Sequence, residues 1–71
     1  MPRVFDVLIE QDEDGWLVAT VPELPGCHTQ AKSQDDLIER IREAILLHLD
    51  AKGPEVPRNR FVGIQHVEVP V

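Results

Sequence analysis

The 71-residue chain has few of the features that usually stabilise a domain of this size. Its single cysteine, Cys27, excludes an intramolecular disulfide and fits the reducing environment of the cytoplasm. A domain this small buries only about 60% of the surface that its unfolded chain exposes. Without a disulfide, the remaining supports to look for are a bound metal and self-association.

Long hydrophobic runs are also absent. The first ten residues, MPRVFDVLIE, are interrupted by Asp6 and Glu10 and contain no apolar segment of secretory length. No later stretch approaches the roughly 20 apolar residues that cross a membrane. We therefore expect a soluble, cytoplasmic protein that makes no contact with a membrane.

Basic residues are outnumbered, because 13 Asp and Glu against 7 Lys and Arg give a formal net charge of −6. Such a chain repels a phosphate backbone and attracts a basic partner. Direct nucleic-acid binding is therefore not expected, although Lys52, Arg58 and Arg60 leave an RNA-associated module as an alternative. The charge also fits the simpler interpretation that acidic residues keep a small protein soluble.

The motifs of common enzyme classes are missing too. The sequence has no phosphate-binding glycine motif, no nucleophile elbow and no paired metal-ligand motif. Cys27 and His28 are adjacent, so in an extended strand their side chains point to opposite faces and cannot act as nucleophile and base. Together with His48 and His66, they show none of the spacings of a zinc site. We expect no metal, no cofactor and no catalytic residue.

Three segments have the pattern of β-strands. Residues 4–10 (VFDVLIE) place apolar side chains on both sides of an extended chain, residues 16–21 (WLVATV) are rich in β-branched and aromatic side chains, and residues 27–32 (CHTQAK) can pair as a third, more polar strand. The turn QDEDG joins the first two, with a positive φ expected at Gly15. Residues 22–26 (PELPG) form a bend, because their two prolines cannot donate hydrogen bonds within a sheet.

A helix is predicted from Gln34 to about Ala51, where apolar residues recur at helical spacing. Ser33 and Asp36 resemble an N-cap with an acidic third position, and Gly53 followed by Pro54 supplies the stop.

After the helix, residues 61–69 (FVGIQHVEV) alternate well enough for a last strand, with a bulge at Gly63. The sequence thus favours a single α+β domain over residues 1–71. Its expected architecture is an antiparallel sheet in the order β-β-β-α-β, with one helix packed on one face.

Apolar side chains occur on more faces than one helix can cover. The first two predicted strands carry them on both sides, and two helix residues leave the core stripe. Each one that a second subunit buries would contribute about 1.5 to 3 kcal/mol before the cost of association. We therefore predict a homo-oligomer, a dimer or tetramer, although scattered exposed apolar residues also occur on monomers. The candidate self-association residues are Val4, Leu8, Val18, Leu46 and Leu47.

The first turn is acidic. Asp12, Glu13 and Asp14 lack the spacing of a Ca²⁺-binding loop, so a solvated hairpin tip explains them better than a cation site. Such a tip can still face a basic partner. Asp12, Glu13, Asp14 and Trp16 are therefore the candidate partner-binding residues.

The run IEQDEDGWLVATVPELPGCHTQAKS, followed by IREAILLHL, resembles the HicB-type antitoxin family, specifically its small N-terminal domain. The resemblance covers roughly residues 4–49 and includes the acidic turn with Gly15, the aromatic Trp16 and the bend from Pro22 to Cys27 in the same order. It implies a fold like a truncated ribonuclease-H-like sheet without its catalytic carboxylates. It also implies a function in binding and neutralising a small basic HicA-type toxin that cleaves RNA.

Two features differ from the family pattern. Ala31 and Lys32 stand where the family often has glycine followed by a polar residue. Full antitoxins commonly carry a C-terminal DNA-binding segment, which these 71 residues leave no room for, so operator binding is not expected here. The alternatives are an orphan oligomeric scaffold and a small hydrolase or nuclease that uses Asp6, Glu10 or His28.

Overall fold

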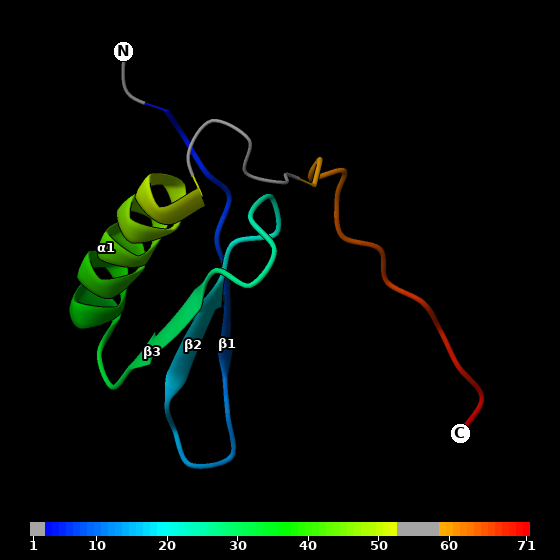
Figure 1. Ribbon diagram of the computed structural model, residues 1–71. Coiled ribbons are helices and arrows are strands. Elements are labelled where there is room, and N and C mark those ends of the chain that lie inside the picture. Colours follow the sequence, from blue (N-terminus) through cyan, green and yellow to red (C-terminus); the bar gives the residue numbers. More distant parts are fainter. Residues whose placement is uncertain (1–2, 53–58) are drawn as a thin grey trace.

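The computed structural model describes residues 3–52, without the side chain of Lys52, and residues 59–71. Along the chain it contains β1 (Leu8–Gln11), β2 (Leu17–Thr20), β3 (His28–Ala31) and α1 (Gln34–Lys52) (Figure 1). The predicted α+β class and the order of these four elements are confirmed. Each strand is shorter than the sequence pattern predicted.

The central strand β2 pairs antiparallel with both β1 and β3. Its Ala19 lies between Ile9 of β1 and Thr29 of β3, so these three residues share one face of the sheet. On this face α1 packs over β3 and β2, and it makes no close backbone contact with β1. No described element covers the opposite face, which we call the open face (Figure 1). The strand residues of the open face are Leu8, Glu10, Val18, Thr20, His28 and Gln30.

The core lies between α1 and the sheet, and the bend at residues 22–26 contributes to it. Leu24 is fully buried. Its N–H donates to the carbonyl of Val21 at 3.1 Å, and its own carbonyl accepts from the N–H of Cys27 at 3.0 Å. Gly26 reverses the chain with a φ of +85°, which a side chain would strain. The buried core residues are Ala19, Val21, Leu24, Cys27, Ala31, Leu37 and Ile41.

The helix begins as the sequence predicted. The Ser33 hydroxyl accepts a hydrogen bond from the N–H of Asp36 at 3.2 Å, and the Ser33 carbonyl accepts from the N–H of Leu37 at 3.0 Å. The helix ends at Lys52, next to the predicted stop, but Gly53 and Pro54 lie outside the described residues. Within the described ranges, no helix has the length and apolar character needed to cross a bilayer.

The prediction of a last strand at residues 61–69 was wrong for this chain. Residues 59–71 have no strand hydrogen bonding, and Figure 1 shows them leading away from the sheet in an extended conformation. Gly63 has a φ of +158°, but without a neighbouring strand it marks no bulge. The alternating pattern indicated an extended backbone, whereas a strand also needs a hydrogen-bonding partner.

Candidate functional site

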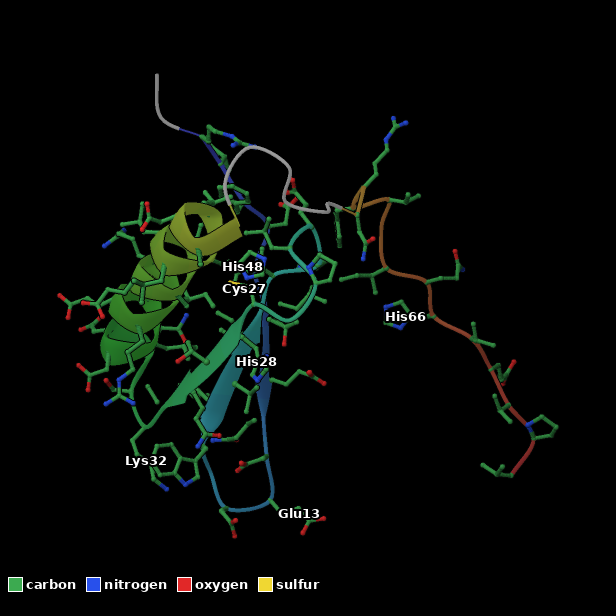
Figure 2. The ribbon with its side chains drawn as sticks, in the orientation of Figure 1. Glu13, Cys27, His28, Lys32, His48 and His66 are labelled. Atoms are coloured by element: carbon green, nitrogen blue, oxygen red, sulfur yellow. The ribbon has the colours of Figure 1, made fainter. Side chains whose placement is uncertain are left out.

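The hairpin between β1 and β2 exposes two acidic side chains and uses a third for its own stability. The Oδ1 atom of Asp12 accepts hydrogen bonds from the N–H groups of Asp14 at 3.0 Å and Trp16 at 2.9 Å. Gly15 has the predicted positive φ, +86°. Glu13 and Asp14 are exposed, and Figure 2 shows Glu13 at the end of the hairpin. We call Glu13 and Asp14 the acidic tip.

The candidate partner-binding residue Trp16 is half-buried beneath a lysine of the same chain. The Nζ atom of Lys32 lies 4.2 Å from the centroid of the Trp16 ring and donates to the carbonyl of Asp14 at 3.4 Å. A cation over an aromatic face is stabilising. Sequence reasoning missed this contact, although antiparallel pairing of residues 16–21 with 27–32 places Trp16 opposite Lys32. Any partner that binds Trp16 therefore meets both the ring and this ammonium group.

The five self-association candidates are distributed over three places. Val4 is exposed in the segment before β1. Leu8 and Val18 are half-buried on the open face. Leu46 and Leu47 are 62% and 69% exposed on α1. Leu8 and Val18 share the open face, and Leu46 and Leu47 are neighbours on α1, so the five candidates do not form a single patch.

Cys27 and His28 are separated as the sequence predicted. Cys27 is buried in the core, and this burial raises the pKa of its thiol, while His28 is exposed on the open face. Figure 2 shows His48 on the helix and His66 on the segment that leads away from the sheet. Among the described residues, no three His, Cys, Asp or Glu side chains form a group that could hold a metal ion.

The residues of the alternative hydrolase hypothesis are not brought together. Glu10 and His28 share the open face, but β2 lies between their strands. Glu10 is opposite Val18 and His28 is opposite Thr20, so the two residues are also offset along the strands. Among the described residues, no hydrogen bond joins their side chains. The alternative of an RNA-associated module rests on three basic residues. Arg60 is exposed, but Arg58 and the side chain of Lys52 lie outside the described residues.

Comparison with known proteins identifies the family. Residues 5–68 match the model described as "HicB_like antitoxin of bacterial toxin-antitoxin system". A UPF0150 protein of Archaeoglobus fulgidus is 57% identical over 65 residues, covering 92% of this chain and 93% of the relative. UPF0150 proteins of Synechocystis and Thermotoga maritima are 45% identical over 65 residues and 32% identical over 68 residues, with at least 91% of each chain covered. The matched range contains the acidic hairpin, the bend, the helix and most of the C-terminal segment, and the chain therefore belongs to the HicB-like antitoxin family.

Proposed function

We propose that this protein is an antitoxin that binds and neutralises a small basic, RNA-cleaving toxin of the HicA type. It acts in the cytoplasm by direct contact and without catalysis of its own. The observation that carries the proposal is the match of residues 5–68 to the antitoxin family. The formal net charge of −6 gives a basic toxin a complementary partner.

The acidic tip and Trp16 are the proposed contact site for the toxin. Glu13 and Asp14 are exposed at the end of a hairpin that the Asp12 side chain holds in shape. A rigid protruding turn can place its carboxylates against a basic surface without a large loss of conformational freedom. We also propose that the active form is a homo-oligomer, a dimer or tetramer, which would present the site more than once.

The test is an RNA-cleavage assay with a purified HicA-type toxin from the source organism. Stoichiometric addition of this protein should abolish cleavage, and the two proteins should elute as one complex. Reversing both charges of the acidic tip, in the variant Glu13→Lys, Asp14→Lys, should weaken the complex at least tenfold.

The matched control is Glu39→Lys, Asp50→Lys, which makes the same change in net charge on exposed residues of α1. This control should retain most of the affinity if contact at the tip, rather than overall charge, governs binding. Equal losses in both variants would rule out the tip as the contact site. Unchanged cleavage without any complex would contradict the antitoxin function and leave an orphan oligomeric scaffold.

A further inference from the structure

The C-terminal segment exposes apolar side chains that its own chain does not cover. Val62, Val67 and Val69 are 90%, 75% and 60% exposed. Val67 and Val69 alternate with His66 and Glu68, so residues 66–69 have one apolar face, whereas Val62 and Ile64 lie on the opposite side of the extended chain. The family match extends to residue 68, so this segment is part of the domain.

The sheet has an open edge along β1. The N–H of Asp12 donates to the carbonyl of Trp16. In an antiparallel ladder, every second residue directs its backbone hydrogen bonds to the neighbouring strand. The backbone groups of Glu10 and Leu8 therefore also point toward β2. The backbone N–H and carbonyl groups of Ile9 and its alternate neighbours then point outward. No strand of the described chain pairs with them.

The other edge of the sheet is protected. The N–H of Val21 donates to the carbonyl of Cys27 at 3.0 Å, so these two residues form a hydrogen-bonded pair. Hydrogen-bonded pairs alternate along an antiparallel ladder, and the backbone of Gln30 therefore points away from β2. The guanidinium of Arg40 on α1 donates to the Gln30 carbonyl at 2.9 Å. A side chain from the helix thus occupies a hydrogen-bonding position at the β3 edge. In contrast, α1 makes no close backbone contact with β1, and Ile9 is 40% exposed on the helix side.

We propose that residues 61–69 form an exchanged strand that pairs with the open β1 edge of a second copy of this chain. The segment supplies an extended backbone and an apolar side, and the edge supplies unpaired backbone groups beside the uncovered Ile9. Addition of a strand to a free sheet edge is a common mode of protein association. This inference does not depend on the antitoxin function.

A second copy of this chain fits the open β1 edge better than another partner does. Each chain carries both a free β1 edge and an unpaired extended segment. In Figure 1 this segment leads away from the sheet of its own chain. Two copies can exchange their segments reciprocally, which closes a two-fold symmetric dimer and leaves neither half unused. Pro70 follows the segment directly, so residues 61–69 themselves contain no proline and each has a backbone N–H for pairing.

The first test is the oligomeric state by analytical ultracentrifugation of the full chain. The wild type should be a dimer at micromolar concentration. Val67→Asp should raise the dimer dissociation constant at least tenfold, because it puts a charge on the apolar face of the segment. His66→Asp introduces the same side chain one residue away on the other face and should change the constant less than threefold. A monomeric wild type, or equal effects of the two variants, would overturn the proposal.

The second test locates the segment in the dimer. A sample mixed from isotope-labelled and unlabelled chains should show intermolecular NOEs between the Val67 and Val69 methyl groups of one chain and Ile9 of the other. NOEs between these groups within one chain would mean that the segment folds back on its own sheet. A dimer whose segments show no contact with Ile9 would place the interface elsewhere, and either result would overturn the exchange.

Discussion

Asp12 shows how one side chain in a cluster of like charge can have a structural role. Its neighbours at the acidic tip are exposed, whereas its carboxylate accepts two backbone N–H groups and fixes the turn. Hydrogen bonds to a charged acceptor contribute more than neutral ones, although exposure to solvent reduces their effect. The three acidic residues of the turn are therefore not equivalent.

Replacing Asp12 with alanine should lower the free energy of unfolding by about 1 kcal/mol, because two N–H groups of a tight turn lose their acceptor. Glu13→Ala changes a neighbouring carboxylate that makes no such bonds and should cost less than about 0.5 kcal/mol. Urea unfolding followed by circular dichroism measures both. Equal losses would show that the Asp12 bonds do not stabilise the hairpin.

Cys27 should make stability depend on pH at the alkaline end. Burial raises the pKa of its thiol above the ordinary value of 9.0, so the native state resists forming the thiolate. The unfolded chain loses this proton first, and the free energy of unfolding therefore falls as the pH rises above 9.0 toward the pKa of the folded state. Below that range the thiol is protonated in both states and has no effect.

Urea unfolding at a series of alkaline pH values, in wild type and Cys27→Ala, measures this dependence. The wild type should lose stability more steeply than Cys27→Ala, because the two proteins differ only in this thiol. The chain has no tyrosine to complicate the comparison. Parallel pH profiles would mean that Cys27 does not ionise differently in the folded and unfolded states.

At the scale of elements, the bend between β2 and β3 is part of the core. Leu24 is fully buried although it lies between two prolines. Leu24→Ala should therefore destabilise the protein by about 2 to 5 kcal/mol through the cavity that it leaves. Leu46→Ala truncates the same side chain at a position that is 62% exposed and should cost under about 0.5 kcal/mol. Similar losses from the two variants in chemical unfolding would refute the structural role of the bend.

The sequence predicts elements well where the physical cause is local. The helix over residues 34–52, the Ser33 cap and the positive φ of Gly15 each depend on residues close together in the sequence. Each of these predictions is confirmed. The separation of Cys27 from His28 also follows from local strand geometry. Structural features that depend only on neighbouring residues can thus be predicted from the sequence before the fold is known.

Features that depend on long-range pairing could not be predicted in the same way. The lysine above Trp16 requires the register of β2 with β3, and the Arg40 contact requires the position of α1 over the sheet. The last predicted strand failed for a related reason, because alternation in residues 61–69 does not say which edge, or which chain, supplies the hydrogen bonds. The candidate partner-binding and self-association surfaces remain predictions.

At the scale of the whole molecule, a thin core coexists with separate uncovered apolar surfaces. The buried core consists of only a few side chains between one helix and three short strands. The C-terminal segment, the open face and the outer side of α1 all retain apolar groups that water would contact in a monomer. Assembly through the exchanged segment would bury Val67 and Val69 and leave the acidic tip available for a toxin.

Thermal stability should therefore depend on protein concentration. If unfolding is coupled to dissociation of a dimer, a tenfold increase in concentration stabilises the folded state by about 1.4 kcal/mol per dimer, which corresponds to a rise in Tm of roughly 3 °C or more for a chain of this size. Differential scanning calorimetry at concentrations spanning two orders of magnitude measures the shift. Val67→Asp should have a nearly constant Tm over the same range, since it unfolds mostly as a monomer, while His66→Asp should follow the wild type. A wild-type Tm that does not change with concentration would mean that the small core of residues 3–52 is sufficient on its own, and that the apolar C-terminal segment has a role other than holding two copies together.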